Sequence, residues 1–174
     1  MKRSFLVTLG LIFACISLHA QNIFTVVHAT SDDGFVNVRT APNSKSGIVA
    51  KINEAFYGLG NGILLGEKNG RWVKVSVGNK TGWANSSYLG KQTWYSGKGQ
   101  YRLVANATRT EVYREDYSED DGVSFLGYVK KGTIIADRNF TEDDDYYILQ
   151  TAHDCLYIPK SQVKKGSVDI YCGH

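Results

Sequence analysis

A histidine and a cysteine near the end of the sequence are the residues whose types could support nucleophilic chemistry. His153 stands two positions before Cys155, so an imidazole could in principle activate the thiol. A nucleophilic cysteine also needs a base held in position and a donor for the oxyanion, and spacing alone supplies neither. We therefore expect no catalytic residues and no enzyme activity.

The same thiol has a simpler partner in Cys172. The third cysteine, Cys15, lies in an N-terminal stretch that we expect to be removed after export. In an oxidising compartment the two remaining cysteines most simply pair. A disulfide between Cys155 and Cys172 would contribute roughly 3 kcal/mol in the chain-entropy model. It would also tie the tail, residues 167–174, to the body of the protein.

Two acidic clusters, within residues 115–121 and 142–145, could bind a cation or a basic partner. An EF-hand with Gly122 at its invariant position would place Tyr117 and Tyr128 where carboxylates are needed, so that motif fails. A looser calcium site, a surface for a basic partner, and solvated loops that protect strand edges remain as alternatives. The histidines are too scattered for a zinc pattern. We expect no metal and no other cofactor.

Aromatic side chains are the other candidates, because their faces provide contact area at little entropic cost. The chain has 11 Tyr and 3 Trp. The pair Trp94-Tyr95 lies in a polar, glycine-rich stretch, where packing between two units is favoured over ligand contact. Arg39 could brace a carboxylate within the fold or face a ligand. The candidate ligand-binding residues are Arg39, Tyr57, Trp72, Tyr88, Trp94, Tyr113 and Tyr117.

The elements that must position these side chains are short strands. Apolar or β-branched runs alternate with turn residues, and helical periodicity is scarce. Asn69-Gly70 between the runs at 63–66 and 72–77 predicts a hairpin, because both turn residues tolerate positive φ. Many short strands at regular spacing predict an all-β barrel or sandwich.

The strand pattern occurs twice. Trp72 and Trp83 match Tyr146 and Tyr157 at an offset of 74, and each pair is 11 residues apart (83 − 72 = 157 − 146). Residues 48–52 match 125–129 at an offset of 77, which predicts shorter middle loops in the second copy. Such aligned patterns indicate a duplicated β-domain. We predict domains at 22–90 and 101–166, joined by a linker at 91–100.

Residues 1–20 have the organisation of a signal peptide. Met1-Lys2-Arg3 is positive, residues 5–18 are mostly apolar, and Ala20 offers a cleavage site. The apolar run is too short for a membrane span, which needs about 20 residues. Cys15 loosely fits a lipoprotein motif. We expect export to the periplasm or the exterior, with membrane attachment only if Cys15 is lipidated.

The charge balance argues against nucleic-acid binding. The chain has 20 basic and 17 acidic residues, a net charge of +3. Without Lys2 and Arg3 the balance is 18 against 17, or +1. A nucleic-acid binder needs a basic stripe, which this composition does not indicate.

Residues 36–42, which read Val-Asn-Val-Arg-Thr-Ala-Pro, resemble the opening of bacterial Src-homology-3-like (SH3-like) domains. Residues 47–52, 66–75 and 80–89 are similar to the second strand, the distal hairpin and the closing strand of that family. The second half is more divergent, with residues 110–113 at the place of the Asn-Val-Arg strand. The resemblance implies two tandem small SH3-like β-barrels after a signal peptide.

Members of that family commonly accompany cell-wall hydrolases and are thought to bind wall peptides. We expect no papain-like catalytic domain after the second copy. The resemblance therefore implies an exported, non-catalytic binding module for a cell-wall peptide, a glycopeptide or a protein ligand. The alternative is a periplasmic adaptor, inhibitor or immunity-type protein that binds a partner through its acidic loops. Fold alone does not decide between them.

Overall fold

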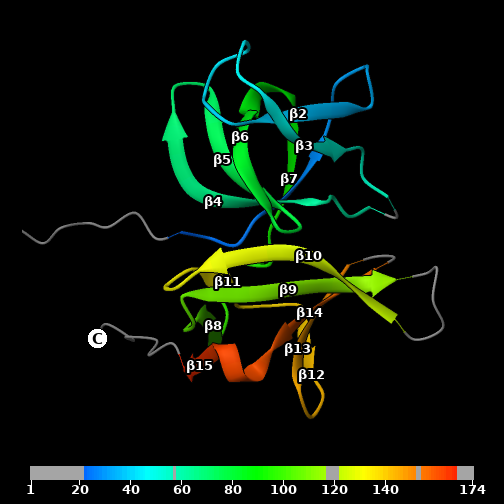
Figure 1. Cartoon of the computed structure of the whole chain (residues 1–174). Coiled ribbons are helices and arrows are strands. Elements are labelled where there is room, and N and C mark those ends of the chain that lie inside the picture. The colour runs from blue at the N-terminus through cyan, green and yellow to red at the C-terminus, as the bar shows by residue number, and fades with distance from the viewer. Residues whose placement is uncertain (1–21, 57, 117–121, 152–153, 168–174) are drawn as a thin grey trace, which may run out of the picture.

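The computed structural model of the chain is all-β (Figure 1) and describes residues 22–56, 58–116, 122–151 and 154–167. These ranges contain fifteen strands and two 3₁₀ helices of three residues each. Neither helix, the only two in the described ranges, is long enough to cross a bilayer. We call residues 26–92 the first unit and residues 101–167 the second unit. The Asp116 and Gly122 ends of one hairpin flank residues outside the description.

The first unit is one antiparallel sheet of seven strands in the order β3-β2-β6-β5-β4-β1-β7. The one-turn helix η1 (Ser86–Tyr88) joins its last two strands. The strands are β1 (Val26–Ala29), β2 (Phe35–Arg39), β3 (Ile48–Asn53), β4 (Gly62–Asn69), β5 (Trp72–Val77), β6 (Lys80–Asn85) and β7 (Leu89–Gln92).

The second unit has two antiparallel sheets, in the orders β10-β9-β14-β13-β12 and β11-β8-β15. The helix η2 (Lys160–Gln162) again precedes the last strand. The strands are β8 (Tyr101–Ala105), β9 (Arg109–Asp116), β10 (Gly122–Lys130), β11 (Ile134–Ala136), β12 (Phe140–Glu142), β13 (Tyr146–Gln150), β14 (Cys155–Pro159) and β15 (Val163–Ser167).

The strand pairing of the first unit recurs in the second, with β11 and β12 together in the place of β4. Arg39 lies opposite Trp83, and Tyr113 lies opposite Tyr157. These pairs are related by the offset of 74. Val38 pairs with Ala50, and Val112 pairs with Gly127. Val38 and Val112 are related by the offset of 74, and their partners by the offset of 77. The registers of these strands therefore correspond between the two units.

Local sequence explains two close features of the first unit. The predicted hairpin joins β4 to β5, and Gly70 has a φ of 58°, a backbone conformation that glycine adopts without steric cost. Gly82 lies against β2, where a Cβ atom would be 2.5 Å from the carbonyl oxygen of Arg39. Only a residue without a side chain allows β6 to approach this closely.

The apolar residues form two clusters. One is confined to the first unit and contains Val36 and Val38, which are 6% and 0% exposed. Trp83 lies outside this cluster and is half-buried. The second cluster crosses between the units, because Phe24 and Ile63 pack in one cluster with Leu103 and other residues of the second unit. The two units therefore share a core.

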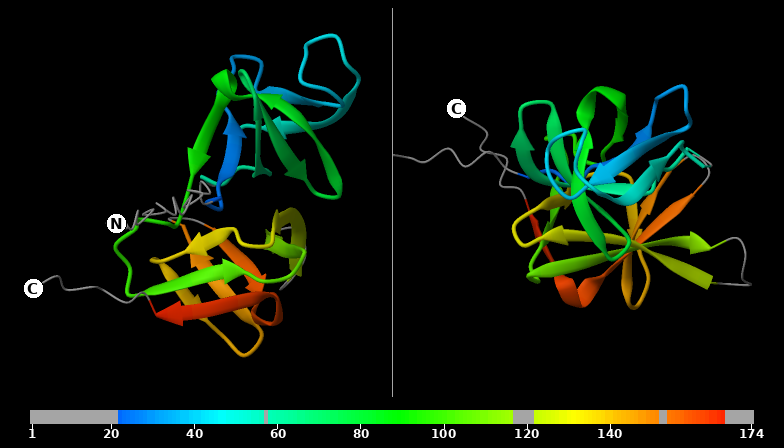
Figure 2. Two further views of the ribbon diagram at one scale, coloured as in Figure 1. Left: turned by 90° about the vertical axis from the view of Figure 1, so that its left-hand side faces the viewer. Right: turned by 45° about the horizontal axis from the view of Figure 1, so that its top comes forward.

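Polar contacts also join the units, which are stacked in the views of Figure 2. Gly78 donates its N–H to the carbonyl of Leu126 at 2.9 Å. Glu67 in β4 forms an ion pair with Lys130 in β10. Burial alone would raise the pKa of Glu67, but the hydrogen bond from Lys130 holds that pKa below its ordinary value. The seam between the units is thus a mixed polar and apolar interface.

The chain segments that flank the first unit both contact the second. Phe24 donates to the carbonyl of Ile134 at 2.7 Å, and Ile134 donates to that of Asn22 at 2.8 Å. Trp94, in the predicted linker, is 2% exposed, stacks on Phe24 with ring centroids 5.6 Å apart, and bridges to Ala136. The linker is therefore packed against the second unit.

Candidate functional site

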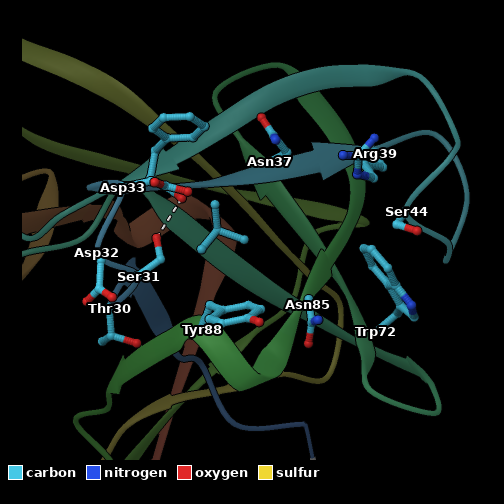
Figure 3. Close-up of a pocket in the computed structure, with 12 residues that line it drawn as sticks. Thr30, Ser31, Asp32, Asp33, Asn37, Arg39, Ser44, Trp72, Asn85 and Tyr88 are labelled. Atoms are coloured by element: carbon cyan, nitrogen blue, oxygen red, sulfur yellow. Dashed lines mark hydrogen bonds between the residues drawn. The ribbon is translucent and has the colours of Figure 1, made fainter.

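A groove of about 580 Å³ lies on the first unit, beside β2 and η1 (Figure 3). It contains three of the predicted ligand-binding residues, Arg39, Trp72 and Tyr88, which come from β2, β5 and η1. The groove is lined by Thr30, Ser31, Asp32, Asp33, Phe35, Val36, Asn37, Arg39, Ser44, Trp72, Asn85 and Tyr88.

Arg39 forms one end of the groove together with Trp72 (Figure 3). Its Nη1 atom donates to the carbonyl oxygen of Ser46 at 2.7 Å, which holds the loop at 40–47 against β2. The Ser46 hydroxyl in turn donates to the carbonyl of Ala41 at 2.8 Å. No ion pair joins Arg39 to a carboxylate among the described residues. Of the two roles expected for Arg39, the internal carboxylate brace is therefore absent from this part of the chain.

Tyr88 lies midway along the groove and is 50% exposed. The side chain of Asn85 caps η1 by accepting the N–H of Ser87 at 3.1 Å. The Ser86 hydroxyl donates to the carbonyl of Arg71 at 2.9 Å. These local bonds fix the single turn on which Tyr88 stands, so that its ring is presented to the groove.

Asn37 contributes an unused hydrogen-bond acceptor. It alternates along β2 with the core residues Val36 and Val38, so its side chain lies on the opposite face. Its Oδ1 atom is buried and accepts no hydrogen bond from the described residues. A buried polar atom without a partner costs free energy.

Asp32 and Asp33 form the other end of the groove (Figure 3). The turn that carries them is closed by the N–H of Gly34, which donates to the carbonyl of Ser31 at 3.0 Å. The Ser31 hydroxyl also donates to the carbonyl of Phe35 at 2.7 Å. Both carboxylates are exposed, and neither forms an ion pair within the described residues.

The second unit has the corresponding positions but no corresponding groove lining. By strand register, the counterpart of Arg39 is Tyr113. Tyr88 and Gln162 are the last residues of η1 and η2. The counterparts of Asn37, Arg39 and Tyr88 are, in that order, Glu111, Tyr113 and Gln162.

These three side chains of the second unit bind one another. The Tyr113 hydroxyl donates to Glu111 Oε2 at 2.8 Å, and this hydrogen bond raises the pKa of Tyr113. Gln162 donates to the same carboxylate at 3.3 Å and accepts the N–H of Glu111 at 2.7 Å. These three side chains therefore satisfy one another in the second unit, whereas the described residues show no hydrogen bond among their counterparts in the first.

The other predicted ligand-binding residues do not join the groove. Trp94 is buried and its indole Nε1 donates to the carbonyl of Gln150 at 2.9 Å, which fits the packing role expected for it. Tyr113 lies in the second unit. Tyr57 and Tyr117 are outside the described residues.

Much of the acidic cluster at 142–145 is engaged locally. Glu142 pairs with Lys160 at 3.2 Å and with Lys165 at 2.7 Å. Asp143 accepts the N–H groups of Asp145 and Tyr146 at 2.9 and 2.6 Å. Most of the other cluster, residues 117–121, is outside the description. Within the described ranges, no three His, Cys, Asp or Glu side chains gather as metal ligands.

Cys155 is half-buried, and burial raises the pKa of its thiol, with a further contribution from Glu115. The preceding residue, Asp154, pairs with Arg114 at 2.6 Å. Burial raises the pKa of Asp154 in spite of this partner. His153 and Cys172 lie outside the described residues, so both the catalytic pair and the disulfide stay predictions.

Sequence reasoning missed the acidic end of the groove. No motif or spacing in the sequence distinguishes Asp32, Asp33 or Asn37 as ligand contacts. The available signal was the alternation in β2, which places Asn37 and Arg39 on one face. Neither a protein-family model, nor a curated protein, nor a solved structure matches this chain. The site is therefore interpreted from its own geometry.

Proposed function

We propose that this chain is an exported, non-catalytic binding module that takes a short cell-wall peptide in the groove of the first unit. One observation carries the proposal. Glu111, Tyr113 and Gln162 bind one another in the second unit. Their counterparts in the first unit are Asn37, whose Oδ1 atom accepts no hydrogen bond from the described residues, the unpaired Arg39, and the half-exposed Tyr88. The Tyr88 ring and the guanidinium N–H groups of Arg39 that do not bind Ser46 are available to a ligand.

The chemistry of the groove suits a peptide. An exposed tyrosine ring offers contact area with few rotatable bonds, and Arg39 has guanidinium N–H donors beyond the one that binds Ser46. The resemblance of residues 36–42 to bacterial SH3-like domains supports the same ligand class. In this proposal the second unit serves as a scaffold, because its corresponding side chains are already satisfied.

The test is retention of the mature chain, residues 21–174, on purified cell-wall fragments at low salt. Tyr88→Ala should weaken retention by about tenfold, as expected for an aromatic contact at the centre of a site. Tyr101→Ala is the matched control, because Tyr101 is also 50% exposed and lies in the second unit. That variant should bind normally.

Failure of the unsubstituted chain to bind any wall fragment would refute the proposal. Stoichiometric co-purification of a basic protein, lost when Asp144 and Asp145 are both replaced by Asn, would instead favour the adaptor alternative. Those two carboxylates are exposed beside the engaged Glu142.

A further inference from the structure

We propose that the groove binds a dipolar peptide in one direction, with a free carboxylate at Arg39 and a free ammonium group at Asp32 and Asp33. This inference rests on the proposed function and names the ligand class of the same site. The groove carries opposite charges at its two ends (Figure 3), and no described residue neutralises either end.

The cationic end has the donors that a carboxylate needs. A guanidinium carries five N–H donors in a fixed planar arrangement, and the only side-chain hydrogen bond of Arg39 within the described residues is the one from Nη1 to Ser46. That bond holds the side chain at the groove and leaves other donors for a ligand. Arg39 is half-buried, so its charge is less screened than that of a fully exposed arginine.

The anionic end is more open. Asp32 and Asp33 are adjacent, exposed, and held in a turn by the bonds of Ser31. Exposed carboxylates alone would not define a site. Here they share a groove with Arg39, which forms no ion pair within the described residues. The reversed ligand would place like charges together at both ends, which is unfavourable.

The second unit lacks both charged ends. Tyr113 replaces Arg39 there, and the segment between β8 and β9 is limited to residues 106–108, which contain no acidic residue. The charge separation is therefore a property of the first unit and does not follow from the shared strand pairing.

The experiment titrates the mature chain with a synthetic stem-type pentapeptide that carries a free C-terminal carboxylate and one free lysine amine. Amidating the carboxylate should weaken binding by about tenfold, as expected for loss of a charge-assisted hydrogen bond. Acetylating the amine should weaken it by about two- to fivefold, because the partner carboxylates are exposed.

Variants assign each effect to its end of the groove. In Arg39→Gln, amidation of the peptide should no longer matter, whereas acetylation should still weaken binding. In the double variant D32N/D33N, acetylation of the peptide should no longer matter, whereas amidation should still weaken binding. Lys80→Gln and Glu54→Gln remove matched charges outside the groove and should retain both effects. Mere loosening of the 40–47 loop in Arg39→Gln would instead weaken all peptide forms equally.

The two levels of the proposal fail differently. Equal binding of the free, amidated and acetylated peptides would overturn the dipolar inference and leave the proposed function standing. Lack of binding by every form, together with no retention on wall fragments, would overturn both.

Discussion

The hydroxyl of Ser76 in β5 both donates to the carbonyl of Tyr128 in β10, at 3.2 Å, and accepts its N–H, at 3.4 Å. This reciprocal contact joins the two units at a point where Gly127 has no side chain. A Cβ atom on Gly127 would lie 2.8 Å from Ser76 Oγ and 3.1 Å from Ile63 Cδ1. The two units are therefore held together by the close approach of their strands at Gly127 as well as by the shared core.

Gly127→Ala should destabilise the protein by about 1–3 kcal/mol, because the added methyl group must displace a packed neighbour. Urea unfolding monitored by fluorescence and by circular dichroism should still give one coincident transition, since the units share a core. Gly166→Ala is the control, because among the described residues no atom beyond its chain neighbours lies within 4 Å of its added Cβ. Two separated transitions in the unsubstituted protein would contradict the shared core.

Asp137→Asn should loosen the linker. The Asp137 carboxylate accepts hydrogen bonds from the N–H groups of Ser96 at 2.7 Å and of Lys98 and Gly99 at 3.1 Å. Loss of these charge-assisted bonds should lower the free energy of unfolding at pH 7 by about 1–3 kcal/mol.

The pH dependence of Asp137 has a definite sign. Burial alone would raise the pKa of Asp137, but the N–H donors of Ser96 and Gly99 hold that pKa below its ordinary value. Its stabilisation is therefore complete above the unfolded pKa of about 3.9 and is lost as the pH falls through the lower folded value. Unfolding measured from pH 6 to pH 2 should show a shallower acid decline in Asp137→Asn. Parallel profiles would refute this role, and exposed Asp144→Asn serves as the control.

Two corresponding residues should separate stability from binding. Gln162→Ala should lower the free energy of unfolding by about 1–2 kcal/mol, because it removes the hydrogen bonds of Gln162 with Glu111. Tyr88→Ala should change stability by no more than about 0.5 kcal/mol yet weaken peptide binding. Thermal unfolding and peptide titration of both variants provide the comparison. The reverse pattern would show that the first unit, too, uses these positions for folding.

The thiol of Cys155 should be unreactive. The mature, non-reduced protein should contain no free thiol if Cys155 pairs with Cys172. In a reduced Cys172→Ser variant at pH 8, alkylation of Cys155 should be several-fold slower in the folded protein than in the protein unfolded in urea. The reason is that burial raises the pKa of Cys155 and the thiolate is the reactive form. Two free thiols before reduction would contradict the disulfide, and fast alkylation would revive a catalytic role.

Local features of the fold were predictable from the sequence. The hairpin at Asn69-Gly70 and the burial of Val36 and Val38 follow from turn chemistry and from the two-residue period of a strand. The repeat was detectable because aromatic residues such as Trp72 and Tyr146 stand at corresponding strand positions. Each of these signals is short in range or repeats along the chain.

The seam and half of the groove were not predictable in this way. Ser76 is an ordinary strand residue in the sequence, and only the approach of Tyr128 from the second unit gives it a partner. The acidic pair at Asp32 becomes informative only once the fold places it across a groove from Arg39. Contacts between distant segments depend on how the two units stack, which local patterns do not encode.

The pairing of Phe24 with Ile134 also constrains the order of events when the chain is made. Phe24 is synthesised early, but its partner Ile134 in β11 is synthesised only after more than half of the residues that follow Phe24. The core that includes Phe24 and Trp94 thus cannot close on a nascent first unit alone. Folding is expected to be late and comparatively slow, as it is for proteins whose contacts join distant residues.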